Sequence, residues 1–138
     1  MAALRILALV SLPLLIAGCS PSDLGTVHGT VMLDGKPLPN ALIQFYPKAG
    51  GGAAQARTGA DGSYELIQDR DTRGARIGEY EVRISTADAP GGDYGKPSPE
   101  TVPAKYNLKS ELMATVEPGR NQIDFLDLDS TSAIIQPR

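Results

Sequence analysis

The feature that most constrains this chain is an alternation of apolar and polar residues with a period of two. It is clearest at residues 80–85, where Tyr80, Val82 and Ile84 are separated by charged or polar side chains. Successive side chains of a strand point to opposite faces, so such a segment buries one face and exposes the other to water. The pattern is typical of antiparallel sheets, which commonly pack one face on a core.

The same alternation recurs along most of the chain between turn signals. The 138 residues include 15 glycines and 11 prolines, a density of turn-forming residues that favours short strands over helices. No helical pattern is sustained after the first eighteen residues. The predicted fold is therefore an all-β, antiparallel Greek-key β-sandwich of about seven strands. These strands are expected at residues 26–33, 41–46, 55–58, 64–67, 80–85, 112–116 and 123–128.

Two segments lack this pattern. Residues 87–110 contain four prolines and form an excursion longer than the connections of compact domains usually are. We expect this excursion to be either functional or loosely packed. Residues 129–138 show no pattern that would pair them with a strand, so the sequence predicts a flexible tail there.

The N-terminus has the features of a bacterial export signal. Arg5 is followed by an apolar run over residues 6–16 that is too short to span a bilayer, which takes about 20 residues. The run leads into Ile16-Ala17-Gly18-Cys19, which resembles the lipobox of bacterial lipoproteins and contains the only cysteine of the chain. The thiol of such a cysteine accepts diacylglycerol. We therefore predict a lipoprotein signal peptide at residues 1–18 and a lipidated tether at residues 19–25, with the lipid on Cys19.

The lipid makes the bilayer the first expected partner. A bacterial lipoprotein usually carries two or three acyl chains such as palmitate, and more than one chain is needed for stable anchoring. The predicted location is the cell envelope, at the outer membrane because Ser20 rather than aspartate follows the cysteine; either its periplasmic or its surface face is compatible. The net charge of −3 shows no basic excess, so nucleic acid is not an expected partner.

Four motifs occur along the mature chain in a recognisable order. They are residues 27–31 (VHGTV), 34–41 (DGKPLPNA), 61–64 (DGSY) and 78–84 (GEYEVRI). In this order the chain resembles the carboxypeptidase regulatory-like (transthyretin-like, prealbumin-like) β-sandwich, and more narrowly the small lipid-anchored versions common in planctomycete-type bacteria. The resemblance spans residues 26–128 and departs from the family at Asn40, where glycine is usual, and at Ile77, where proline is common. It implies a binding or stabilising accessory domain without catalytic residues.

Few residues of the chain offer catalytic or metal chemistry. His28 is the only histidine, whereas metal sites and nucleophilic triads need clustered donors, so we expect a solvent-facing strand histidine. The transthyretin-related hydrolases depend on several histidines, so the resemblance does not extend to their activity. We predict no enzyme activity, no metal and no cofactor.

The charged loop at residues 69–76 is a second candidate ion site, after His28. Asp69 and Asp71, with Asp61, offer the oxygens that calcium prefers, but arginines stand where further ligands belong. Phosphate or an acidic sugar suits arginines, but the interleaved aspartates neutralise them; the arginines concerned are Arg70, Arg73 and Arg76. We therefore expect a solvated charged loop.

Two tyrosines of the long excursion, Tyr94 and Tyr106, are candidate residues for binding carbohydrate. Aromatic rings in a loop either stack on sugars or pack onto the sandwich. The predicted function is a membrane-anchored, non-catalytic binding or structural module at the cell envelope. It would meet an envelope protein through a sheet edge or through residues 87–110. Carbohydrate binding through Tyr94 and Tyr106 is the alternative.

Overall fold

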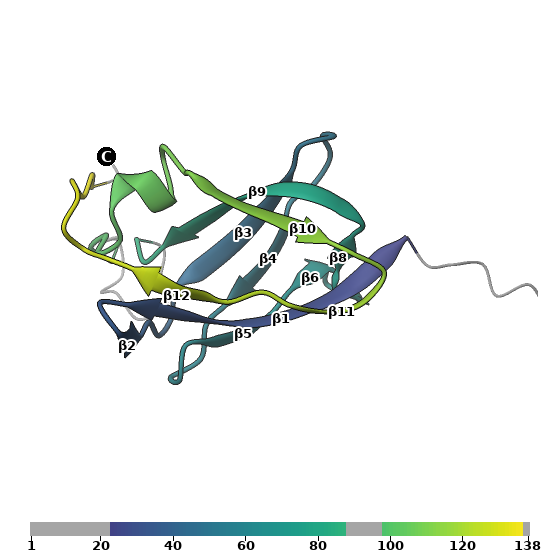
Figure 1. Cartoon of the computed structure of the whole chain (residues 1–138), viewed down its shortest axis with the longest axis horizontal. Coiled ribbons are helices and arrows are strands. Elements are labelled where there is room, and N and C mark those ends of the chain that lie inside the picture. Colours follow the sequence, from purple (N-terminus) through teal and green to yellow (C-terminus); the bar gives the residue numbers. More distant parts are fainter. Residues whose placement is uncertain (1–22, 88–97, 137–138) are drawn as a thin grey trace, which may run out of the picture.

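Two β-sheets packed face to face make up the fold (Figure 1). The computed structural model describes residues 23–87 and 98–136. Five short strands pair with the long strand β1 (Leu24–Leu33) to form one sheet: β2 (Lys36–Pro37), β5 (Ser63–Glu65), β8 (Ala75–Arg76), β11 (Gly119–Gln122) and β12 (Phe125–Leu128). The second sheet has the order β10 (Leu112–Val116), β9 (Gly78–Ser85), β3 (Leu42–Pro47), β4 (Ala54–Arg57), β6 (Ile67–Asp69) and β7 (Thr72–Arg73). The predicted all-β sandwich is confirmed.

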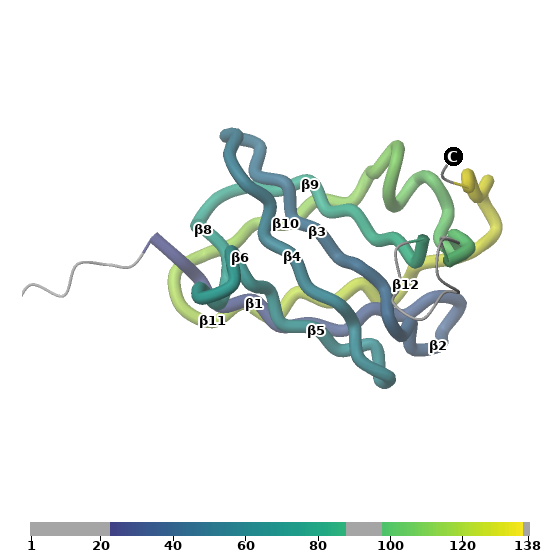
Figure 2. The backbone as a smooth tube through the Cα atoms, turned by 180° about the vertical axis from the view of Figure 1, so that it is seen from behind, coloured from purple at the N-terminus to yellow at the C-terminus, as the bar shows by residue number. Residues whose placement is uncertain are grey.

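The second sheet has the strand order of a Greek key. Strands β3, β4 and β6 lie side by side in the order in which they occur in the chain. Strand β9 then returns to lie beside β3 (Figure 2). Pairing is antiparallel throughout the described residues, except that β11 and β12 run parallel to β1. The parallel pairing arises because the chain crosses from β10 to the other sheet beside the start of β1, where Gly119 lies opposite Gly25.

The alternation seen in the sequence produces the core. Seven inward side chains of β1, β3 and β9 are at most 1% exposed: Val27, Val31, Ile43, Phe45, Tyr80, Val82 and Ile84. The ring of Phe45 packs against two others, with centroids 5.6 Å from Tyr80 and 6.4 Å from Phe125. The Tyr80 hydroxyl donates to the Arg76 carbonyl at 2.6 Å, which supplies the hydrogen bond that a buried polar group requires.

The strand predicted at residues 64–67 is in fact divided between the two sheets. Strand β5 pairs with β1, whereas β6 pairs with β4 in the other sheet. The chain crosses at Leu66, whose side chain is fully buried. Its N–H donates to the Val27 carbonyl at 3.0 Å, and its carbonyl accepts from the Gly74 N–H at 2.7 Å. A single side chain thus fills the core while the backbone changes partner.

Other strand boundaries also differ from prediction. Strand β1 begins at Leu24, so two residues assigned to the tether belong to the sandwich. At the other end, residues 119–122 lie outside the predicted strands but form β11, and β12 begins at Phe125 instead of at residue 123. Between these two strands Ile123 passes close over Gly29, with its N–H donating to the His28 carbonyl at 2.8 Å.

Residues 129–136, for which the sequence predicts a flexible tail, make hydrogen bonds to other parts of the fold. Ser130 donates through its backbone N–H and its hydroxyl to the Asp34 carboxylate, at 3.0 and 2.5 Å. The Asp129 carboxylate accepts from Lys105 at 2.9 Å and from the Tyr106 hydroxyl at 3.1 Å. These partners lie far from the tail in sequence, which is why no local pattern revealed them.

Acid is expected to loosen this tail. Hydrogen bonds from Thr131 and Lys105 lower the pKa of Asp129, and those from Ser130 lower the pKa of Asp34. A carboxyl with a depressed folded pKa stabilises the fold above its ordinary pKa of 3.8, and the contribution is lost as the pH falls below that value. The amide NMR signals of Thr131 and Ala133 should therefore stay constant between about pH 7 and 5 and shift below about pH 4.

A pair of variants isolates the cause of this acid response. Asp34→Asn/Asp129→Asn removes both charges and should abolish the acid step in the tail signals. Asp127→Asn changes an exposed carboxylate of β12 and should leave the step in place. Persistence of the full step in the double variant would show that other groups hold the tail.

The predicted signal peptide, residues 1–18, and Cys19 lie outside the described residues. Within residues 23–87 and 98–136, no helix has the length and apolar character needed to cross a membrane. A single 3-10 turn, η1 (Ala104–Tyr106), is the helical element of this described part.

Candidate functional site

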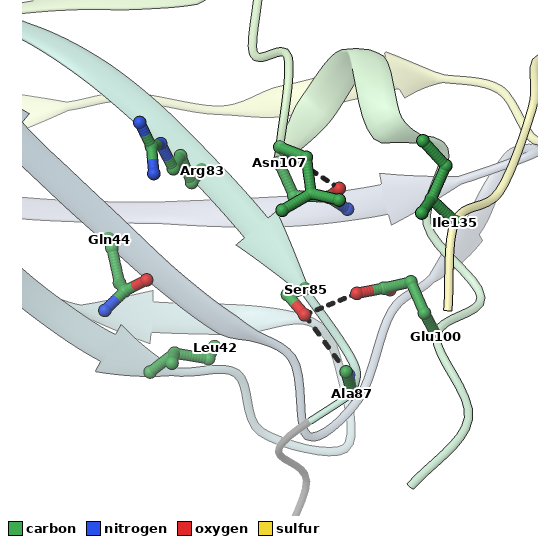
Figure 3. Close-up of a pocket in the computed structure, with 9 residues that line it drawn as sticks. Leu42, Gln44, Arg83, Ser85, Ala87, Glu100, Asn107 and Ile135 are labelled. Atoms are coloured by element: carbon green, nitrogen blue, oxygen red, sulfur yellow. Dashed lines mark hydrogen bonds between the residues drawn. The ribbon is translucent and has the colours of Figure 1, made fainter. Parts of the chain in front are cut away.

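A pocket of about 210 Å³ opens on the outer face of the second sheet (Figure 3). Residues from three parts of the chain line it: the strands β3 and β9, the excursion after β9, and the C-terminal tail. The lining side chains are Leu42, Gln44, Arg83, Ser85, Ala87, Glu100, Asn107, Leu108 and Ile135. Residues 87–110 were predicted to be either functional or loosely packed, and part of this excursion forms a wall of the pocket.

Strand register builds the floor of the pocket. Leu42 lies opposite Ser85 and Gln44 opposite Arg83, so the outward side chains of β3 and β9 form two adjacent rows. The rim is apolar, because Leu108 is 62% exposed and Ile135 is 40% exposed. Exposed apolar side chains beside a preformed hollow are typical of a surface that binds another molecule.

The Glu100 carboxylate is the most unusual group of the pocket, because the residue is only 6% exposed. Its Oε1 accepts from the backbone N–H groups of Thr86 and Val102 at 3.0 and 2.9 Å and from the Thr86 hydroxyl at 3.0 Å. Its Oε2 accepts from the Ser85 hydroxyl, which also accepts from the Ala87 N–H at 3.2 Å (Figure 3). Within the described ranges no cation forms an ion pair with Glu100.

This arrangement gives Glu100 a positioning role. Burying a carboxylate is costly unless hydrogen bonds replace its water, and here backbone and hydroxyl donors occupy both oxygens. The backbone of Glu100 forms two hydrogen bonds with the Gln136 side chain. The Gln136 amide donates to the Glu100 carbonyl and accepts from the Glu100 N–H, each at 2.9 Å. Glu100 therefore joins the end of β9, the excursion and the tail at the back of the pocket.

Asn107 fixes the opposite wall. Its amide Nδ2 donates to the carbonyls of Ile84 and Val102, both at 3.1 Å, and its Oδ1 accepts from the Leu108 N–H at 2.8 Å. Asn107 is itself only 6% exposed. These bonds hold the backbone beside Leu108 in place, so the exposed leucine projects from a fixed support.

Arg83 supplies the positive charge of the pocket. Its Nε lies 2.8 Å from a Glu81 oxygen, and its guanidinium carbon lies 4.6 Å from the centre of the Tyr46 ring. Contacts of this kind restrict the side chain at the surface. The site thus combines an apolar rim with one oriented cation and buried hydrogen-bonded walls, which suits a peptide-like ligand better than an isolated ion.

The residues singled out in the sequence lie elsewhere. Tyr94 and Cys19 fall outside the described residues. Tyr106 is 7% exposed and belongs to the core cluster, so its ring does not offer a face to a sugar; of the two expectations for it, packing onto the sandwich is the one observed.

The charged-loop aspartates bind their own neighbours. Asp61 accepts from the backbone and hydroxyl of Ser63 at 3.1 and 2.6 Å, and Asp69 accepts from the Asp71 N–H at 3.0 Å. These bonds lower the pKa of both carboxyls. Among residues 23–87 and 98–136 no three acidic, histidine or cysteine side chains form a group that could hold a metal ion.

Sequence reasoning missed Glu100 and Asn107. Both lie in a proline-rich stretch without periodicity, and their partners are distant in the chain. No signal in a single sequence marks a glutamate there as buried, because the surrounding residues are those of an exposed loop.

The chain has a distant structural likeness to a protein of known structure. No known protein family and no curated protein matches this chain. Among solved structures, the crystal structure of a DUF3823 family protein from Parabacteroides merdae aligns over 76% of this chain and 44% of that chain, with 15% sequence identity and a TM-score of 0.40. The chain thus spans less than half the length of that protein, and the likeness carries no argument about function.

Proposed function

We propose that this chain is a lipid-anchored module of the bacterial cell envelope that binds a protein partner through the pocket beside Leu108 and performs no catalysis. The observation that carries the proposal is the place of this pocket, which is lined by residues beside η1 and in the C-terminal tail. These segments lie at the end of the sandwich opposite the start of β1 (Figure 1). We call the end with the pocket and the tail the far end. We call the end where β1 begins the anchor end.

The anchor end is tied closely to the proposed lipid. Four residues separate Cys19 from Leu24, the first residue of β1. An extended chain spans at most about 3.6 Å per residue, so the start of β1 would lie within about 20 Å of the lipidated cysteine. Such a tether is too short to let the module turn its anchor end away from the bilayer.

The far end would then point away from the membrane. The Ile77 N–H donates to the Asp23 carbonyl at 2.8 Å, so β9 starts beside the anchor end, and it finishes at Ser85 in the pocket. At about 3.3 Å per residue, the length of β9 places the pocket more than 20 Å, roughly, from that end. A pocket so placed is accessible to other envelope proteins.

Protein rather than carbohydrate is the favoured ligand class. The rim offers exposed aliphatic side chains, Leu108 and Ile135, which bury apolar surface on a protein partner. Carbohydrate binding was the alternative that depended on Tyr94 and Tyr106, and the one of these in the described part of the chain, Tyr106, is in the core. Fixed walls and an oriented Arg83 support recognition without large rearrangement.

The test uses the full chain in living cells, with a photo-crosslinking amino acid in place of Leu108 and growth on alkyne palmitate. The chain should take up the palmitate label and sediment with membranes, and illumination should join it to a protein of defined mass. The same amino acid in place of Leu126, a 46% exposed leucine on the outer face of the other sheet, should give no such product.

Two outcomes would overturn parts of the proposal. Cys19→Ser should abolish both the label and the membrane sedimentation, and equal labelling of this variant would refute the anchor. A labelled, membrane-bound chain that gives no product from position 108, or the same product from positions 108 and 126, would refute binding at the far end.

A further inference from the structure

Strand β10 is an edge of the second sheet, and its outer side has no partner strand among the described residues. Its inward side chains Leu112 and Ala114 are only half-buried, whereas Val82 and Tyr80 opposite them on β9 are buried. Met113, on the outer face, is 49% exposed. The edge is therefore open to solvent from Leu112 to Thr115, whereas Val116 at the end of the strand is fully buried.

The direction of the free backbone groups follows from the register. The Lys48 N–H donates to the Glu79 carbonyl at 3.0 Å, so Glu79 and every second residue after it on β9 hydrogen-bond with β3. Tyr80 and Val82 must then hydrogen-bond with their partners Ala114 and Leu112 on β10. Consistent with this assignment, Tyr80 lies opposite Pro47 of β3, and proline has no N–H to donate.

The backbone N–H and C=O groups of Met113 and Thr115 consequently point away from the sheet. In an antiparallel pair successive residues direct these groups to alternate sides. Two such residues with one residue between them form the hydrogen-bonding template that an added strand uses. Neither a proline nor a bulge blunts β10 at these positions.

Acidic side chains surround this open edge. Glu111 and Glu117 flank the strand immediately on either side, and Glu79 lies directly opposite Thr115 on β9. All three glutamates are exposed. The basic residues Lys109 and Arg120 lie farther from the strand than the flanking glutamates, one before it and one after it in the chain.

We propose that the β10 edge binds an extended segment of a partner protein, which adds a strand to the second sheet and carries basic residues at its ends. Its backbone would pair with Met113 and Thr115, and its inward side chains would cover Leu112 and Ala114. Its basic ends would face Glu111 and Glu117. This surface shares no residue with the pocket at the far end, so the module would have two separate contact sites.

A second copy of the chain fits this edge less well. Antiparallel pairing of two β10 strands about Ala114 would set Glu111 of each copy opposite Glu117 of the other. Like charges directly opposite on paired strands are destabilising. The glutamates thus oppose self-pairing while they attract a basic strand, a known way of protecting sheet edges.

The probe is a capped peptide, Lys-Val-Thr-Val-Thr-Val-Lys, titrated into the purified full chain in mild detergent and followed by NMR. Its seven residues match residues 111–117, with the lysines at the two ends. We expect saturable shifts of the Met113 and Thr115 amides and slower hydrogen exchange at both. The same peptide with glutamate in place of both lysines should bind several-fold more weakly, because like charges replace opposite ones.

Two variants separate the backbone contribution from the charge contribution. Thr115→Pro removes one outward N–H at an edge position, where proline is tolerated, and should abolish binding while the signals of the core remain. Glu111→Lys/Glu117→Lys should reverse the preference between the two peptides.

Several results would overturn this inference. Equal binding of both peptides, binding that leaves the two amides unchanged, or no binding at millimolar peptide would each do so. Self-association that Thr115→Pro removes would show that a second copy covers the edge instead. Since Leu108 lies outside β10, crosslinking from position 108 is unaffected by these outcomes, and the two proposals can fail separately.

Discussion

Replacing Gly29 with alanine is expected to lower the free energy of unfolding by at least about 4 kcal/mol, the range of the most damaging single substitutions. A Cβ at this position would lie 1.7 Å from the Ile123 carbonyl oxygen and 2.7 Å from a ring carbon of Tyr64. The first of these atoms is backbone, which cannot move aside as a flexible side chain can. The clash lies at residues 123 and 124, which connect β11 to β12 beside β1.

The surrounding hydrogen bonds make this contact hard to relieve. The Tyr64 hydroxyl donates to the same Ile123 carbonyl at 2.5 Å, and burial raises the pKa of that hydroxyl. The Thr30 N–H donates to the Asp124 carboxylate at 2.8 Å. Moving residues 123 and 124 away from Gly29 would break these bonds together with the one from the Ile123 N–H to His28.

Chemical denaturation of the purified chain measures this effect, with Gly52→Ala as the matched control. A Cβ at Gly52 would meet no atom within 4 Å, and the backbone there is not left-handed. The control should change stability by less than about 1 kcal/mol. A Gly29→Ala chain as stable as the control would mean that the close passage of Ile123 over β1 is not part of the fold.

Gly29 also shows how far the sequence could lead. The alternation around it correctly predicted a strand with Val27, Gly29 and Val31 on the inward face, because period two is a local property of the chain. What lies against Gly29 was not predictable. Ile123 is ninety-four residues away in sequence, and nothing near either residue indicates the other.

Leu66 marks a second limit of prediction from the sequence. Apolar and polar residues alternate through residues 64–66 as they would in one strand, yet the backbone leaves one sheet at Glu65 and enters the other at Ile67. Local periodicity reports which side chains are buried, and it is right that Tyr64 and Leu66 are. It does not report which strand the backbone pairs with, because both sheets face the same core.

The candidate site was the least predictable part of the molecule. Residues 98–107 looked like an irregular loop because four prolines interrupt the excursion, although Val102, Ala104 and Tyr106 are buried in it. Pro103 and Asn107 are buried as well, so burial in this segment follows no single period. The pocket then depends on three segments meeting at Glu100, and such a meeting is a tertiary property.

Replacing Glu100 with alanine should lower the free energy of unfolding by about 3 kcal/mol or more, because leaving buried donors without acceptors costs about 1–3 kcal/mol each. The donors left behind are the N–H groups of Thr86 and Val102 and the hydroxyl of Ser85. Glu111→Ala, which removes an exposed carboxylate, is the matched control and should change stability by less than about 0.5 kcal/mol.

Glu100→Gln distinguishes a need for hydrogen bonding from a need for volume. The glutamine carbonyl can keep the bonds from Thr86 and Val102, and its NH₂ group can donate to the Ser85 hydroxyl, which both donates and accepts. The loss should therefore be about 1 kcal/mol, well below that of Glu100→Ala. If Glu100 joins the walls of the pocket, Glu100→Ala should also reduce crosslinking from position 108 at temperatures where the chain is still folded, whereas Glu100→Gln should retain it. Equal stability of the alanine and glutamine variants would contradict this role, because it would mean that the four donors around the carboxylate do not depend on an acceptor.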